Sequence, residues 1–203
     1  MMSWGAYVEL ADLMRAEDGV AQTVTPMRFA LVLCLDDERA RSHVKMRWGL
    51  VPHWQKDPTL GTRLIHARGE SIDEKPSFRE AFANRRGLLI VKTFNEGEEV
   101  TPKKTRQHTI APNDGKPIGI AVIWERWREE HAGELLTFAM VTVAANKLIG
   151  KITDRMPAVI APENWRKWLG EDAATLGELK ALLVPMEGDW NMAPEIKAPP
   201  PLL

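Results

Sequence analysis

The sequence lacks the features that mark secreted and membrane proteins. It contains a single cysteine, Cys34, which excludes an internal disulfide and is typical of a reducing compartment. No apolar run approaches the roughly 20 residues that a membrane helix needs. Residues 1–5 show neither the basic start nor the apolar core of a secretory signal. These absences predict a cytoplasmic protein that does not bind a membrane.

Recognisable metal and phosphate motifs are also missing. The five histidines are scattered along the chain, and none belongs to an H-E-x-x-H or Cys/His pattern of the kind that binds zinc. The glycines form no phosphate-binding loop. We therefore expect neither a metal ion nor another cofactor.

Length and hydrophobic patterning favour one domain with an α+β fold. The 203 residues are 44% hydrophobic and 27% charged, which is enough to bury a core. The apolar segments do not alternate regularly with long helices, which argues against a doubly wound parallel sheet. We expect a mainly antiparallel β-sheet core with peripheral helices over residues 1–203, of which 198–203 form a Pro-rich tail.

Short apolar segments and turn signals place the expected elements along the chain. Residues 102–116 are polar and carry a turn signal, Asn113-Asp114-Gly115. The expected strands span 27–35, 45–51, 87–94, 118–124 and 135–143, and the expected helices span 76–86, 163–169 and 176–183.

Charge is unevenly distributed along the chain, although the net charge is only −1. Residues 39–106 carry 15 Lys and Arg against 8 Asp and Glu, so the remainder is acidic. Such an asymmetry indicates an anionic partner for the central segment. A solvated surface of mixed charge is the alternative, because an excess of basic residues does not by itself establish a binding site.

Four segments carry a family resemblance. They are 47–54 (RWGLVPHW), 64–70 (LIHARGE), 86–96 (RGLLIVKTFNE) and 152–157 (ITDRMP). In order and spacing they resemble the segments WGL-P-W, L-I-N-A-R-x-E, R-C-L-I-P-A-D-G-F-Y-E and I-H-D-R-M-P of the SOS-response-associated peptidase (SRAP) family. On this resemblance the chain is identified as a divergent member.

The resemblance implies a fold of antiparallel strands with peripheral helices and a groove for single-stranded DNA. In the family, a cysteine after the initiator methionine attacks an abasic site with its α-amine, and its thiol then closes a stable thiazolidine crosslink. A glutamate, a histidine and an asparagine around the reacting carbon transfer protons and bind the sugar.

Most of these catalytic positions are replaced in this chain. Glu96 stands where the family has its glutamate, whereas His66 replaces the asparagine and Thr153 replaces the histidine. Ser3 is the residue whose α-amine would become available if translation starts one residue before it and methionine is removed. Cys34 lies in an apolar run and its amine is in a peptide bond, so we expect a buried thiol and the loss of thiazolidine formation.

The roles of the replaced positions are open at this point. Glu96 is expected to act as a general acid or base with a raised pKa; the alternative is a surface carboxylate in an acidic loop with Glu98 and Glu99. His66 could compensate for the missing histidine, since an imidazole titrates near neutral pH. The other interpretation is that these positions changed by sequence drift after the catalytic activity was lost.

Five positions are expected to contact DNA: Arg68, Arg155, Arg47, Trp54 and Pro26. In the family the first two grip phosphates, a bidentate task that suits arginine. The tryptophan would stack on a base, with the proline as its partner. The alternatives are ion pairs of the arginines with Glu70 or Asp154 and a core position for the tryptophan.

Three functions follow from this interpretation. The first is a binder of single-stranded DNA or abasic sites in the DNA damage response that has lost stable crosslinking. The second is an imine-forming lyase that uses the amine of Ser3, since an α-amine with a pKa of about 7.7–8.0 is partly neutral near pH 8. The third is a protein-interaction module that retains only the fold.

Overall fold

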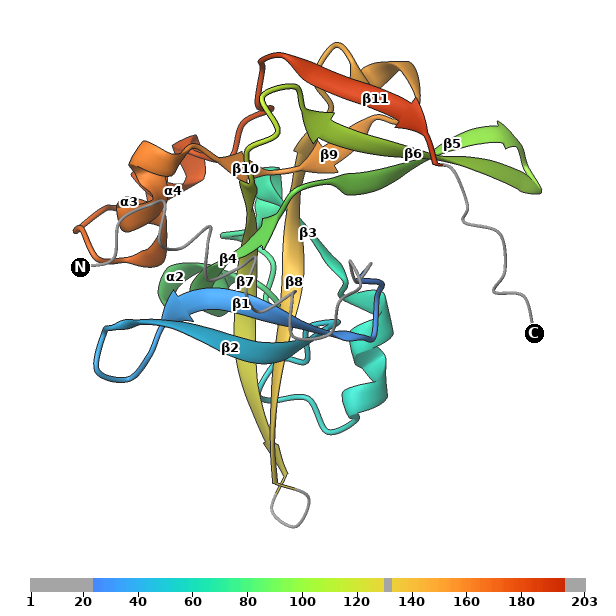
Figure 1. The fold of residues 1–203 in the computed structure, drawn as a ribbon. Coiled ribbons are helices and arrows are strands. Elements are labelled where there is room, and N and C mark those ends of the chain that lie inside the picture. Colours follow the sequence, from blue (N-terminus) through green and yellow to red (C-terminus); the bar gives the residue numbers. More distant parts are fainter. Residues whose placement is uncertain (1–23, 130–132, 196–203) are drawn as a thin grey trace, which may run out of the picture.

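Strands dominate the computed structural model, which describes residues 24–129 and 133–195 (Figure 1). Ser3 and the tail 198–203 lie outside the described residues. The strands are β1 (Phe29–Leu35), β2 (Arg41–Trp48), β3 (His66–Arg68), β4 (Arg86–Val91), β5 (Phe94–Thr101), β6 (Lys104–Pro112), β7 (Ile118–Glu129), β8 (Gly133–Ala144), β9 (Arg155–Pro157), β10 (Val159–Ile160) and β11 (Trp190–Pro194). The helices are α2 (Arg79–Asn84), α3 (Trp165–Leu169) and α4 (Leu176–Ala181), and 3-10 turns span Pro58–Arg63, Gly69–Ser71, Ile149–Lys151 and Pro162–Asn164.

The larger sheet closes into a barrel. Its strands follow the order β10-β7-β4-β1-β2-β8-β3, and β7 also pairs with β8. The strands β7, β4, β1, β2 and β8 therefore form a closed ring, which leaves no free edge among them. Pairing is antiparallel except where β2 and β3 run parallel to β8.

The barrel interior is the hydrophobic core. Inward-facing positions of every barrel strand are fully buried, among them Val32, Met46, Leu88, Ile123 and Phe138. The expected α+β fold with a mainly antiparallel sheet is thus confirmed, and the two parallel pairs are an addition that the sequence patterns do not predict.

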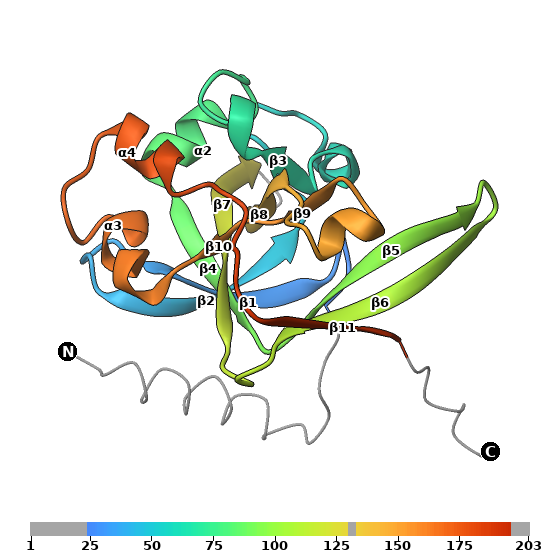
Figure 2. The same cartoon turned by 90° about the horizontal axis from the view of Figure 1, so that it is seen from above.

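Helices cover the barrel rather than forming a layer of their own (Figure 2). On α3, Trp168 is fully buried and its indole Nε1 donates to the Gly87 carbonyl of β4 at 2.8 Å. The Trp165 ring lies so close to Gly119 that an added Cβ would stand 2.6 Å from it, so only glycine fits there. Within the described ranges, no helix has both the length and the apolar character to cross a membrane.

A smaller three-stranded sheet, ordered β11-β6-β5, extends from the barrel as a long hairpin with a third strand beside it (Figures 1 and 2). One expectation is wrong here: the segment 87–94, expected as a single strand, divides into β4 and the start of β5. Strand β6, inside the polar segment 102–116, is not among the expected strands, and the expected turn follows it at 113–115. Because β6 pairs with a strand on each side, its backbone groups are satisfied without an apolar face along its whole length.

Candidate nucleic-acid interface and acid–base site

Arg68 and Arg155 lie on β3 and β9, which flank the same part of β8. Arg68 is the last residue of β3 and pairs in register with Thr142. Arg155 opens β9, on the other side of β8, and its guanidinium donates to the Thr142 carbonyl at 2.7 Å. Two residues that are 87 positions apart in the sequence therefore present positive charge at neighbouring sites on two flanking strands.

In this structure Arg155 is held by a carboxylate. Its Nη1 and Nη2 donate to the two carboxylate oxygens of Glu70 at 2.6 and 2.9 Å, a bidentate ion pair that lowers the pKa of Glu70. The ion pair with Glu70, which the sequence analysis gives as the alternative, is therefore present. An incoming phosphate would compete with Glu70 for the same donors.

His66 and Thr153 lie on the same two segments as the arginines. His66 shares the exposed face of β3 with Arg68, because Ala67 between them is buried. Burial lowers the pKa of the His66 imidazole, whose ring lies 5.9 Å from the Trp48 ring centre. Because its pKa is lowered, the His66 imidazole is predominantly neutral near pH 7. Thr153, two residues before Arg155, is half-buried, and its backbone amide donates to the Ile149 carbonyl at 3.1 Å.

Glu96 is the third residue of β5 and is half-buried. Burial raises the pKa of its carboxyl to about 7, so the acid is partly protonated near neutral pH. The side chain thus has the burial and the titration range that the expected acid–base role requires, unlike a carboxylate in a solvated loop.

The other expected DNA contacts differ in their availability. Trp54 is 54% exposed, as a base-stacking residue would be and a core aromatic would not. Pro26 is also exposed. Arg47 instead turns toward its own protein: its Nη2 donates to the Pro58 carbonyl at 2.9 Å, and burial lowers its pKa. Its contact supports the loop between β2 and β3, which makes it the weakest of the five candidates.

Cys34 is 1% exposed in β1. Burial, with a smaller contribution from the charge of Asp36, raises the pKa of its thiol to about 11. A thiol with this pKa is protonated and weakly nucleophilic at neutral pH.

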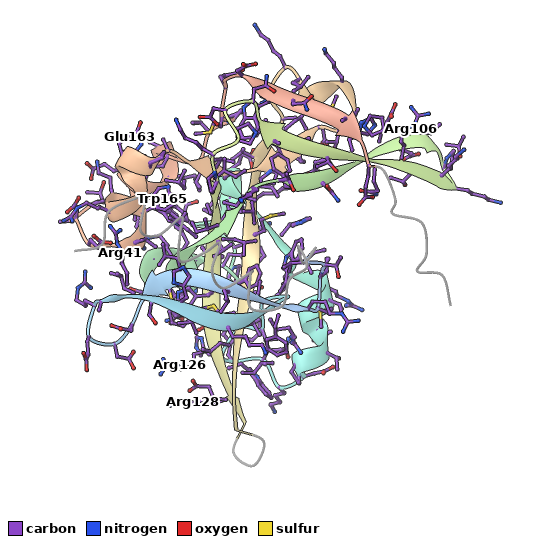
Figure 3. All side chains as sticks on the ribbon, viewed as in Figure 1. Arg41, Arg106, Arg126, Arg128, Glu163 and Trp165 are labelled. Atoms are coloured by element: carbon purple, nitrogen blue, oxygen red, sulfur yellow. The ribbon has the colours of Figure 1, made fainter. Side chains whose placement is uncertain are left out.

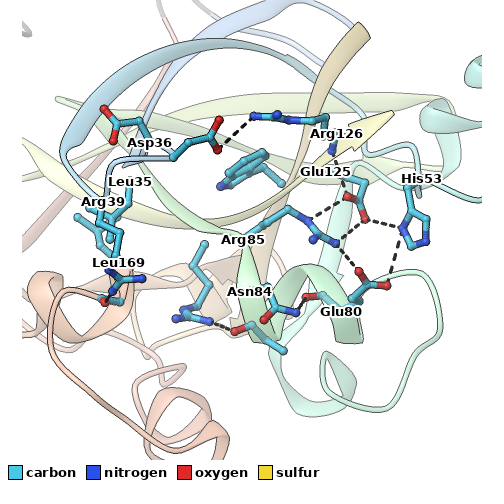
Figure 4. A pocket seen from close by; sticks show the side chains of 15 residues that line it. Leu35, Asp36, Arg39, His53, Glu80, Asn84, Arg85, Glu125, Arg126 and Leu169 are labelled. Atoms are coloured by element: carbon cyan, nitrogen blue, oxygen red, sulfur yellow. Dashed lines mark hydrogen bonds and ion pairs between the residues drawn. The ribbon is translucent and has the colours of Figure 1, made fainter. Parts of the chain in front are cut away.

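A cavity of about 570 Å³, lined by none of these residues, lies beside α2 and α3 (Figure 4). Its charges are already paired. Arg85 forms a bidentate pair with the buried Glu125 and a further contact with Glu80 at 3.1 Å, while the His53 ring is 3.4 Å from Glu125. Among the described residues, no three His, Cys, Asp or Glu side chains are grouped to hold a metal ion.

The sequence patterns miss one buried residue near Glu96. His108 on β6 is 8% exposed and pairs in register with Glu96 across the hairpin. An alternation of apolar and polar residues along β6 would have indicated that His108 points inward, but this polar segment shows no such alternation.

The structure is a closed β-barrel with two arginines on the strands that flank β8 and a half-buried glutamate on an attached hairpin. The chain belongs to the SOS response associated peptidase (SRAP) family, whose model matches residues 10–197. It is 32% identical over 166 residues to the abasic site processing protein YoqW of Bacillus subtilis strain 168, covering 82% of this chain and 74% of that protein. It is 30% identical over 142 residues to the abasic site processing protein YedK of Escherichia coli K12, covering 70% of this chain and 61% of that one.

The fold is also similar to that of solved structures. A crystal structure of a protein from Bacteroides thetaiotaomicron matches with a TM-score of 0.74 at 25% identity, covering 83% of this chain and 74% of that one. A protein from Bordetella bronchiseptica matches with a TM-score of 0.73 at 19% identity, covering 88% and 90% of the two chains, and supports the fold alone.

Proposed function

We propose that this protein binds single-stranded DNA at abasic sites in the DNA damage response and does not form a stable thiazolidine crosslink. The relatives named above are abasic site processing proteins, which motivates the substrate class. The observation that carries the proposal is the placement of Arg68 and Arg155 on the two strands that flank β8 near Thr142, where both lower the pKa of Glu70 and could bind the phosphates of one strand. Cys34, the single cysteine of the sequence, is buried with a protonated thiol and cannot close a ring on an imine.

A binding comparison tests this function. The affinity for a fluorescent single strand with one abasic site is measured against that for the intact strand of the same sequence, at several salt concentrations. We expect salt-sensitive binding of both strands and a preference for the abasic one. Equal affinity for the two strands, or no binding at low salt, would contradict the proposal.

A residual lyase is the second candidate, and the raised pKa of Glu96 favours it. An imine between a protein amine and C1′ of the opened sugar allows a base to take a C2′ proton; the electrons form a C2′–C3′ double bond and expel the 3′ phosphate. A carboxyl with a pKa of about 7 can serve as that base. Borohydride would trap the imine as a covalent adduct, and peptide mapping would tell whether Ser3 carries it.

The Glu70–Arg155 ion pair yields a prediction for DNA affinity. Glu70→Gln removes the charge that competes with phosphate, and since exposed ion pairs contribute up to about 1 kcal/mol, affinity for single-stranded DNA should rise about two- to fivefold. Glu74→Gln, at an exposed carboxylate four residues away, is the control for the change in net charge. If both variants raise the affinity equally, Glu70 does not compete for Arg155.

A further inference from the structure

One face of the β5–β6 hairpin carries a row of polar side chains that leads outward from the core. The pair Phe94 and Ile110 is buried at its start. Two residues further along each strand, and so on the same face, Glu96 stands opposite His108. Glu98 and Arg106 form the next pair, and Arg106 lies on the outer part of the hairpin (Figure 3).

The contact between His108 and Glu98 orients the imidazole. Nε2 of His108 lies 2.9 Å from Oε2 of Glu98. An ionised carboxylate only accepts hydrogen bonds, so Nε2 carries a hydrogen, and in the neutral imidazole Nδ1 is then an acceptor. Arg106 approaches the same carboxylate oxygen at 3.5 Å and supplies a second positive partner.

Nδ1 of His108 is buried and has no hydrogen-bond partner. A buried acceptor without a donor is costly, so it indicates a missing partner. Opposite residues of an antiparallel pair have Cβ atoms only about 4.5–5.5 Å apart. A rotation of the Glu96 side chain therefore brings its carboxyl within reach of Nδ1.

The neighbouring strand offers no competing group. On β11, the register partner of His108 is Pro194. The carboxyl of Glu195 accepts a hydrogen bond from Asn95 at 3.1 Å, and Asn95 points to the opposite face from Glu96. By the alternation of β5 and β6, the charged groups that share the face of His108 on the hairpin are Glu96, Glu98, Arg106 and, at the outer end of β6, Lys104.

We propose that Glu98, His108 and Glu96 form a proton relay in which His108 is a positioning residue that sets the protonation of Glu96 at the abasic sugar; this rests on the proposed function. In the forward step the O–H bond of Glu96 breaks and its proton forms a bond to Nδ1 of His108. The resulting imidazolium is stabilised by the Glu98 carboxylate, and Glu96 becomes an acceptor for a sugar hydroxyl. Return of the proton makes Glu96 a donor again, with no exchange with solvent.

The energetics suit such a relay. Burial raises the pKa of Glu96 to about 7, so its carboxyl gains and loses a proton near neutral pH. Two groups coupled in this way titrate as a pair, in two steps.

The test is the titration of Glu96 in the free protein, followed by the carboxyl carbon resonance of ¹³C-labelled glutamate. In the unmodified protein we expect a two-step curve, and in His108→Gln a single step. His43→Gln, at a histidine on barrel strand β2, is the control and should leave both steps in place. Identical Glu96 curves in the unmodified protein and His108→Gln would overturn the relay.

A second variant guards against misfolding of the first. Glu98→Gln keeps a hydrogen-bond acceptor beside Nε2 but removes the charge, so the ¹⁵N resonances of His108 should shift toward the Nδ1–H tautomer. An unchanged tautomer would contradict the assigned role of Glu98. The preference for abasic over intact strands, measured from pH 6 to 8.5 in both variants, should lose half its value at the pH where Glu96 titrates.

These readouts separate the relay from the proposed function. A two-step titration in a protein without preference for abasic strands would support the relay and contradict the function. A clear preference, with Glu96 titrating identically in the unmodified protein and His108→Gln, would support the function and overturn the relay.

Discussion

Replacing Arg68 and Arg155 together by alanine should lower the affinity for single-stranded DNA at least about tenfold, since even one charge-assisted hydrogen bond contributes roughly 1.5 kcal/mol. The salt dependence should also weaken. Each phosphate contact to a single strand contributes about 0.7 to the slope of log K against log salt, so two lost contacts should reduce that slope by about 1.4. Fluorescence anisotropy at several salt concentrations measures both effects.

The matched control removes two arginines from other surfaces. Arg128 pairs with Glu134 at the end of β7, and Arg166 pairs with Asp172 beyond α3. The double variant Arg128→Ala, Arg166→Ala has the same net charge as the test protein and should retain the slope. Equal loss in the two double variants would mean that net charge, and not the site at Thr142, determines binding.

Glu96→Gln should produce the largest change in how stability depends on pH. The carboxyl has a pKa near 4.5 in the unfolded chain and about 7 in the folded protein. Between these values the folded state holds a proton that the unfolded state has released, so the free energy of unfolding falls as pH rises. Glutamine cannot ionise, and the variant should therefore gain stability relative to the unmodified protein from pH 4.5 to 7, with a constant difference above that range.

Urea unfolding at pH 5 and pH 8 measures this difference. Glu99→Gln, at an exposed carboxylate on the same strand, should show no such trend. If the free energies of unfolding of Glu96→Gln and the unmodified protein depend on pH in the same way, burial does not raise the pKa of the Glu96 carboxyl. The assignment of Glu96 as an acid–base residue then loses its support.

The sequence predicts most strands of the larger sheet because these strands are buried, but it does not predict their closure into a barrel. The apolar segments at β1, β4, β7 and β8 are short and rich in strand-forming residues, a pattern that burial on the inner face of a barrel requires. Strand β6 is different: Thr105, Gln107 and Thr109 point to one face and Arg106 and His108 to the other, so no hydrophobic alternation marks it. Its pairing with two neighbours, which stabilises it, is a tertiary property.

The site is only partly visible in the sequence for a similar reason. The family resemblance locates Glu96, Arg68 and Arg155, but the pairing of Arg155 with Glu70 depends on how β3 and β9 flank β8. The role of His108 depends on the hairpin register, which no local pattern encodes. The inward turn of Arg47 likewise follows from the loop that packs beside it.

The most direct test of the central claim is to run the same mixture of protein and abasic single strand on native and denaturing gels. The account predicts a shifted complex on the native gel and free DNA after denaturation, because the proposed binding is reversible and Cys34, the single cysteine of the sequence, is buried with a protonated thiol. A complex that survives denaturation without any reductant would contradict this account and would mean that the protein crosslinks the lesion after all.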